Sequence, residues 1–285
     1  MSDPLFILAP PRSFTSVACA MLGQHPSACG LPEVNLHVAD KMETWCRLLL
    51  DTRSFLSHGL LRAVAQLCAG GQTDEAIGRA HWWIRFRRGM STADVFHELA
   101  DQAAPRALID KSPATVLHPA FLERAAKAFP GARFLHLTLH PRTTCESIQA
   151  APEILASIQV YSRVADLGPC AALADPEALW LAAHRTIGAF LDPLPPERKL
   201  RVRGEDLLAD PDRALRDIAR WAGFADDESA VEEMKHPERS PFAHLGPASA
   251  RYGNDQKFLE QPALRPGRVR PASLEGPVAW REDGT

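Results

Sequence analysis

Short apolar runs alternate with amphipathic segments along most of the chain. Four runs have the length and composition of buried strands, and each is followed by a proline or a polar turn. They cover residues 5–9, 106–110, 132–139 and 199–204. Helical patterns, with apolar residues at spacings of three and four, follow these runs and also cover 152–167 and 176–191. Strands that alternate with helices predict an α/β fold with a central parallel sheet.

Two stretches depart from this alternation. Residues 38–104 have a helical pattern throughout, and they predict a large helical insertion. Residues 235–285 are rich in proline, glycine and arginine and show no periodicity, which predicts an irregular lid or tail whose last thirty or so residues are extended or partly mobile. We expect residues 1–285 to form a single domain.

Composition and charge exclude several classes of protein. With 285 residues, 46% hydrophobic and 24% charged, the chain can bury a core without disulfides or metal. A net charge of −3 argues against nucleic acid or an anionic membrane as a partner. The six cysteines form no C-x-x-C pair, so we expect no metal site. The first apolar run, about five residues, is too short for a signal peptide or a membrane span, and a cytoplasmic location follows by default.

The loop after the first strand carries groups that suit an anion. Residues 9–16, APPRSFTS, connect the predicted strand to the predicted helix. The first N–H groups of a helix have no partner within the helix and can bind an anion. Arg12 adds a guanidinium fork, and Ser13, Thr15 and Ser16 add hydroxyl groups. The loop lacks the glycines and lysine of a nucleoside-triphosphate P-loop, which disfavours a magnesium-dependent kinase or ATPase. The alternative is that the hydroxyls only cap the helix.

Over Pro4 to about Phe224 the chain resembles the sulfotransferase superfamily, in which a strand leads into P-R-S-G-T-[ST] and a helix. The resemblance is nearer to its protein-tyrosine, small-molecule and polyketide-associated branches than to its cytosolic branch. It implies a P-loop-like three-layer fold and a donor, 3′-phosphoadenosine 5′-phosphosulfate, held at its 5′ end by residues 12–16. Phe14 replaces the family's glycine, so we expect backbone angles open to a non-glycine residue.

Two further family motifs follow in order, each with a departure. In FLHLTLHPRTTCES, Ser147 matches the serine that holds the 3′ phosphate in the family, whereas Leu139 stands where the family has an arginine. Arg142 or a residue from elsewhere would then supply that charge. In RGEDLLADP, Gly204 stands where the family has a tyrosine.

Sulfuryl transfer needs a base and positive charge at the transferring group. Glu33, in GLPEVNLH, is similar to the glutamate that serves as base in some branches of the family. His37 lies four residues later, so the two would share a face if a helix has begun there; His37 would then orient Glu33 or act as the base itself. Lys111 follows the second predicted strand and matches the lysine of the family's D-K-[ST]-P motif, which approaches the sulfuryl oxygens. Each of these residues could instead be structural.

Other polar residues are weaker candidates for a functional role. His136 and His140 fit ordinary structural use. The segment 81–88, HWWIRFRR, could bind nucleic acid or an acidic carrier protein, but it fits better an amphipathic helix with buried tryptophans and exposed arginines. Asn254 and Lys257 are candidate lid residues. The C-terminal arginines resemble the family's basic closing segment only loosely; they are Arg265, Arg268 and Arg270.

Taken together, the resemblance predicts a sulfotransferase that uses Glu33 as general base and needs no metal. Its acceptor would be a hydroxyl or amine of a small, natural-product-like molecule, free or attached to a carrier protein. Two alternatives stay open. One is another type of phosphate-handling transferase, and the other is a non-catalytic nucleotide-binding module with a degenerate 3′-phosphate site.

Overall fold

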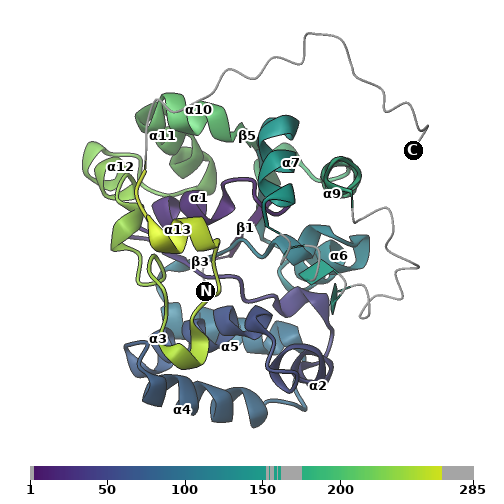
Figure 1. Cartoon of the computed structure of the whole chain (residues 1–285). Helices are drawn as coiled ribbons and strands as arrows, with labels where there is room; N and C mark the ends of the chain where they lie inside the picture. The colour runs from purple at the N-terminus through teal and green to yellow at the C-terminus, as the bar shows by residue number, and fades with distance from the viewer. Residues whose placement is uncertain (1–2, 152–153, 155–156, 159, 162–174, 265–285) are drawn as a thin grey trace, which may run out of the picture.

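The centre of the molecule is a parallel β-sheet (Figure 1). The computed structural model describes residues 3–151, 154, 157–158, 160–161 and 175–264. Its strands are β1 Leu5–Leu8, β2 Ala28–Gly30, β3 Ala107–Asp110, β4 Arg133–Thr138 and β5 Lys199–Arg203. They are ordered β2-β3-β1-β4-β5, and all described pairs are parallel. The predicted α/β fold with a parallel sheet is confirmed.

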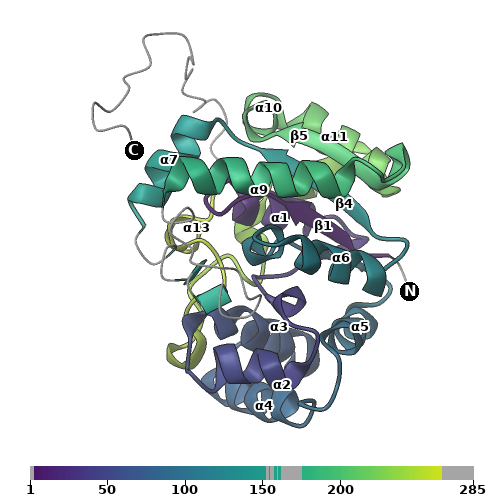
Figure 2. The same ribbon diagram turned by 90° about the vertical axis from the view of Figure 1, so that its right-hand side faces the viewer.

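Helices pack on both faces of the sheet. On one face lie α1 Thr15–Leu22, α10 Gly204–Ala209, α11 Pro211–Ala222 and α12 Glu228–Met234. On the other lie α5 Thr92–Ala103, α6 Pro119–Ala128 and α9 Pro176–Leu191, with α7 Pro141–Gln149 packed on α9. Figure 2 shows α9 lying across the sheet. Together the sheet and its helices form three layers.

The strand side chains explain the two-sided burial. Leu5 and Ile7 of β1 join the cluster around α1 and α11, whereas Phe6 and Leu8 join the cluster around α5, α6 and α9. All four side chains are buried. Successive side chains of a strand point to opposite faces, so a run without polar positions fits a sheet that is covered on both sides.

The central strand pairing determines where the functional loops lie. β1 lies between β3 and β4, with Leu5 opposite Ile109 on one side and Arg133 on the other. The carboxyl ends of these three parallel strands therefore meet at one edge of the sheet. In open α/β sheets this edge is the usual place of ligand binding.

β2 is a strand that the sequence pattern does not predict. It has three residues and ends at Gly30, so it lacks the long apolar run that marks the other strands. It forms because Ala28 to Gly30 pair in parallel with Ala107 to Ile109. A β-carbon on Gly30 would lie 2.5 Å from the carbonyl oxygen of Cys19 in α1, so the close approach of β2 to α1 requires a glycine there.

The segment between β2 and β3 is helical, as its pattern indicates. It contains α2 Met42–Trp45, α3 His58–Ala69, α4 Asp74–Arg85 and α5. Figure 1 shows these helices gathered beyond one end of the sheet. The prediction that both tryptophans of 81–88 are buried is wrong for Trp82, whose exposed fraction is 64%. Consecutive helical residues lie about 100° apart around the axis, so only Trp83 packs against the core.

The last part of the chain is irregular where it is described. Residues 235–264 contain short 3₁₀ turns and one short helix, α13 Gln256–Glu260. The predicted helix over 152–167 falls largely outside the described residues, as do residues 265–285 with their three arginines. Within the described parts, no helix is both long and apolar enough to cross a membrane.

Candidate active site

A pocket of about 830 Å³ opens at the edge where β1, β3 and β4 end. Its wall includes residues from the loop after β1, the segment after β2, α7 and the segment 252–261. The predicted site residues that line it are Arg12, Phe14, Thr15, Ser16, Glu33 and Ser147. Apolar side chains, among them Phe55, Leu56 and Tyr252, make up another part of the wall. The pocket can therefore hold an anionic group next to an apolar one.

The loop after β1 has a strained backbone. Arg12 and Phe14 have φ angles of 66° and 65°, in the left-handed region that favours glycine. The expected backbone is one open to a non-glycine residue, and the left-handed region is open to phenylalanine at a cost of about 1–2 kcal/mol. The turn places Phe14 directly before α1, where its carbonyl accepts a hydrogen bond from the N–H of Ala18. Packing of its ring against the core helps to hold it there.

The three departures from the family motifs lie next to one another. A β-carbon on Gly204 would lie 3.1 Å from a methyl carbon of Leu139 and 3.8 Å from a ring carbon of Phe14. Leu139 and Phe14 both line the pocket. A side chain at 204 would press on Leu139, so the glycine at 204 is compatible with the leucine at 139 and the bulky phenylalanine at 14. Leu139 lies 65 positions before Gly204 and 125 positions after Phe14, so the sequence does not indicate that the three residues are neighbours.

Arg12 joins the first loop to α7. Its Nε donates a hydrogen bond of 3.0 Å to Ser147 Oγ, so the two residues expected at opposite ends of the nucleotide are in contact. Arg142 lies on the outer side of α7, where its side chain is 71% exposed and pairs with Glu146 at 2.9 Å. It does not line the pocket, so in this structure Arg12 is the arginine nearest to Ser147 among the pocket-lining residues.

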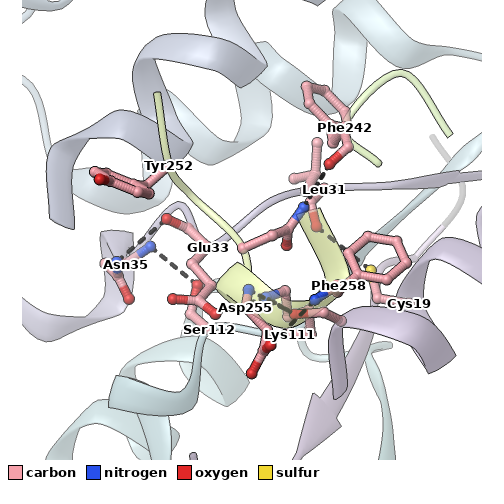
Figure 3. A network of polar contacts seen from close by, with 12 residues as sticks. Cys19, Leu31, Glu33, Asn35, Lys111, Ser112, Phe242, Tyr252, Asp255 and Phe258 are labelled. Atoms are coloured by element: carbon pink, nitrogen blue, oxygen red, sulfur yellow. Dashed lines mark hydrogen bonds and ion pairs between the residues drawn. The ribbon is translucent and has the colours of Figure 1, made fainter. Parts of the chain in front are cut away.

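Lys111 is buried behind the pocket wall. Its Nζ lies 2.6 Å from Glu33 Oε1 and donates to Ser16 Oγ at 2.9 Å (Figure 3). The Lys111 side chain has no exposed surface, whereas Glu33 is 24% exposed and lines the pocket. Burial of an ammonium group requires such partners. The pair thus connects the hydroxyl of Ser16 to the carboxylate of Glu33.

The backbone of Glu33 is held from two sides. Its N–H donates to the carbonyl of Gly253 at 2.7 Å, and its own carbonyl accepts from Asn35 Nδ2 at 3.2 Å. A β-carbon on Gly59, at the start of α3, would lie 2.0 Å from that carbonyl oxygen. Only glycine allows this approach. Buried Tyr161 lines the same pocket, and burial together with the charge of Glu33 raises its pKa well above the usual value, so its phenol stays protonated.

His37 lies in the hydrophobic core rather than in the pocket. Its ring packs at 5.3 Å from Phe6 and 5.4 Å from Phe96, and neither ring nitrogen has a hydrogen-bond partner among the described residues. Burial, with a smaller effect of Arg124, lowers its pKa to about 3. The expected shared helix face with Glu33 is wrong, because Asn35 is left-handed (φ 51°) and the 3₁₀ turn begins only at Leu36.

The remaining predicted residues divide between surface and interior. Ser13 is fully buried, and its hydroxyl has no partner among the described residues. Asn254 and Lys257 line the pocket. His140 caps no helix with its side chain; its backbone N–H donates to Glu205 at 2.7 Å. His136 lies 2.9 Å from His184, ring nitrogen to ring nitrogen.

Asp255 is a site residue that the sequence did not reveal. Its carboxylate forms an ion pair with Arg12, and its backbone N–H donates to Ser16 Oγ at 3.1 Å. No local motif marks an aspartate that lies 243 positions after its arginine. Among the described residues, no cluster of three or more histidine, cysteine, aspartate or glutamate side chains could hold a metal ion.

The buried histidines predict a loss of stability in acid. Burial lowers the pKa of both His37 and His136 to about 3, whereas an unfolded histidine titrates near 6.5. Between these pH values the unfolded chain binds more protons than the folded chain. The free energy of unfolding should therefore decrease as the pH is lowered, by up to about 1.4 kcal/mol per pH unit for each histidine. Urea unfolding at pH 7, 6, 5 and 4 measures this slope.

The variant His37→Phe tests which residue causes the slope. Phenylalanine fits among the neighbouring rings and cannot be protonated, so the slope should become shallower. His244→Gln, at an exposed position, serves as the control and should leave it unchanged. An equally steep slope in His37→Phe would assign the acid sensitivity to other groups.

Comparison with known proteins identifies the family of the chain. A family model described as "Sulfotransferase family" matches residues 4–228. A search of curated proteins gives no match. The chain is 25% identical to the sulfotransferase domain of the Synechococcus PCC 7002 olefin synthase, with a TM-score of 0.72 over 96% of this chain and 92% of that one.

A second solved structure shares the fold. It is the sulfotransferase domain from the curacin biosynthetic pathway, 22% identical, with a TM-score of 0.71 over 96% of this chain and 94% of that one. The family match covers most of the chain, including the loop after β1, Glu33, Lys111 and Ser147. The chain therefore belongs to the sulfotransferase family.

Proposed function

We propose that this sulfotransferase moves a sulfuryl group from 3′-phosphoadenosine 5′-phosphosulfate to a hydroxyl or amine of a small acceptor, with Glu33 as general base. The observation that carries the proposal is that Lys111 contacts both Glu33 and Ser16, two residues that line the same pocket as Arg12 and Ser147. The carboxylate that would act on the acceptor therefore lies next to the cationic and hydroxyl groups that would bind the donor.

The residues present fit an anionic donor. Arg12, Thr15 and Ser16 line the pocket at the start of α1, where the first helical N–H groups lack partners within the helix. Backbone and side chains of residues 12–16 would hold the phosphosulfate, and Ser147 with Arg12 would hold the 3′ phosphate in place of an arginine at 139. The donor supplies an activated sulfuryl group, and the protein contributes position and charge.

Each side chain then has a separate task in the transfer. Glu33 accepts the proton of the acceptor hydroxyl or amine as the new bond to sulfur forms. Lys111 donates to both Glu33 and Ser16, and so holds the carboxylate and the hydroxyl at fixed positions. Arg12 stabilises the charge that develops on the leaving phosphate. His37 has no part in this mechanism, because its ring lies in the core.

The apolar part of the pocket suggests the kind of acceptor. Phe55, Leu117, Ile158 and Tyr252 line it beside Glu33. The solved structures reported above are sulfotransferase domains of an olefin synthase and of the curacin biosynthetic pathway. We therefore propose an apolar, natural-product-like acceptor, free or attached to a carrier protein.

Calorimetry with 3′-phosphoadenosine 5′-phosphate tests the donor. We expect binding in the micromolar range or tighter, with no change on addition of EDTA, and no comparable binding of ATP with magnesium. Absence of binding at high micromolar ligand would refute the proposal. Binding that requires magnesium would favour another phosphate-handling transferase, and binding without turnover on any acceptor would favour a non-catalytic module.

A further inference from the structure

An acidic side chain of the protein itself occupies the cationic end of the pocket. Asp255 lies in the segment 252–261, which we call the strap, and approaches Arg12. One carboxylate oxygen pairs with Arg12 Nη1, and the other accepts from the N–H of Phe258 at 3.2 Å. The backbone N–H of Asp255 donates to Ser16 Oγ at 3.1 Å. Asp255 thus contacts two of the residues proposed to hold the donor.

The ion pair is partly shielded from water. The side chain of Arg12 is 9% exposed and that of Asp255 is 23% exposed. Attraction between charges at such a site is stronger than between freely solvated ones. Arg12 also donates through Nε to Ser147, whereas its Nη1 pairs with Asp255, so the carboxylate occupies a guanidinium nitrogen on the pocket side of the residue.

The strap holds Asp255 in place by contacts on its preceding residues. The carbonyl of Tyr252 accepts from buried Arg62 at 3.0 Å, and that of Gly253 accepts from the N–H of Glu33 at 2.7 Å. Asn254 Nδ2 donates to the carbonyl of Phe242 at 2.9 Å. Gly253 has a φ of 112°, and a β-carbon there would lie 2.8 Å from Cα of Gly59. Asp255 is therefore directed at Arg12 by the backbone, not by chance rotation of a surface side chain.

We propose that Asp255 is an internal anion that competes with the nucleotide donor for Arg12. This inference rests on the proposed function, since it assigns the donor to the loop of Arg12. A sulfate or phosphate oxygen and the Asp255 carboxylate require the same guanidinium edge, and two anions there repel each other. The donor then binds with full strength only to molecules in which Asp255 has left Arg12, and its apparent affinity is reduced by their fraction.

The variant Asp255→Asn tests the competition. Asparagine has nearly the same shape and retains an oxygen that can accept from Phe258, but it carries no charge. We expect calorimetry to show 3′-phosphoadenosine 5′-phosphate binding about tenfold more tightly or better, the range that corresponds to one charge-assisted hydrogen bond. Glu260→Gln is the matched control: Glu260 lines the same pocket and lies in α13, but its carboxylate contacts Gln256. It should change the affinity much less.

A second probe separates this inference from the proposed function. Inorganic pyrophosphate can bind the loop of Arg12 without any nucleotide, and its binding is measured as a rise in the temperature of thermal unfolding. Pyrophosphate should raise this temperature more for Asp255→Asn than for the wild-type chain. Equal or weaker binding of both probes by Asp255→Asn would overturn the competition and make Asp255 a positioning partner of Arg12. If neither chain binds the nucleotide but only the variant responds to pyrophosphate, the competition stands and the proposed donor is wrong.

Discussion

Replacing Glu33 with glutamine should lower sulfuryl transfer by about 10² to 10⁴, because a positioned general base contributes about that factor. Glutamine can still accept a hydrogen bond from Lys111 Nζ, which lies 2.6 Å from the carboxylate in the wild-type protein. The pocket should keep its shape, and the affinity for 3′-phosphoadenosine 5′-phosphate should stay nearly unchanged. Transfer of labelled sulfate to an acceptor that the wild-type chain turns over measures the rate, and calorimetry measures the affinity.

Glu260→Gln controls for the loss of a pocket carboxylate in general, and it should retain most of the turnover. Full activity of Glu33→Gln would move the base to another residue. A parallel loss of rate and nucleotide affinity would instead assign Glu33 a structural role through its pair with Lys111.

Replacing Arg12 with alanine should weaken nucleotide binding by about tenfold or more for each charge-assisted hydrogen bond that is lost, at about 1.5–3 kcal/mol per bond. Arg12 is the pocket cation in contact with Ser147, so one substitution affects both the phosphosulfate loop and the proposed 3′-phosphate contact. Asp255 is 23% exposed and can reach water when its partner is removed, so the fold should persist. Calorimetry gives the affinity, and circular dichroism verifies the fold.

Arg142→Ala is the comparison for charge. Arg142 is 71% exposed and pairs with Glu146, so its loss should change binding little. The two variants together decide which arginine compensates for Leu139. A large loss in Arg142→Ala with little loss in Arg12→Ala would place the 3′ phosphate on the outer side of α7 and reject the assignment made above.

Strands and helices with strong local patterns could be predicted from the sequence. The runs that became β1, β3, β4 and β5 are apolar because their side chains are covered on both faces of the sheet, as the alternating burial of Leu5 to Leu8 illustrates. β2 could not be predicted, since its three residues become a strand only by pairing with β3. Trp82 shows the same limit, because a helical pattern does not tell which of two adjacent tryptophans faces the core.

The candidate site could be predicted in part. Arg12, Ser16, Glu33, Lys111 and Ser147 were singled out by motif, and the structure brings them together around one pocket or directly behind it. The left-handed backbone of Phe14 could not be predicted. Residue type indicates a preference against the left-handed region, but packing around the loop outweighs a preference of about 1–2 kcal/mol.

The sequence by itself determined the alternation of strands and helices and the chemistry of the loop after β1, because both depend on neighbours along the chain. Only the tertiary structure decided that Lys111 meets Glu33, that His37 is enclosed by aromatic rings, and that Asp255 reaches Arg12. These contacts join residues far apart in the chain. They arise because parallel strands end at one edge of the sheet, where loops from distant parts of the sequence are brought within reach of one another.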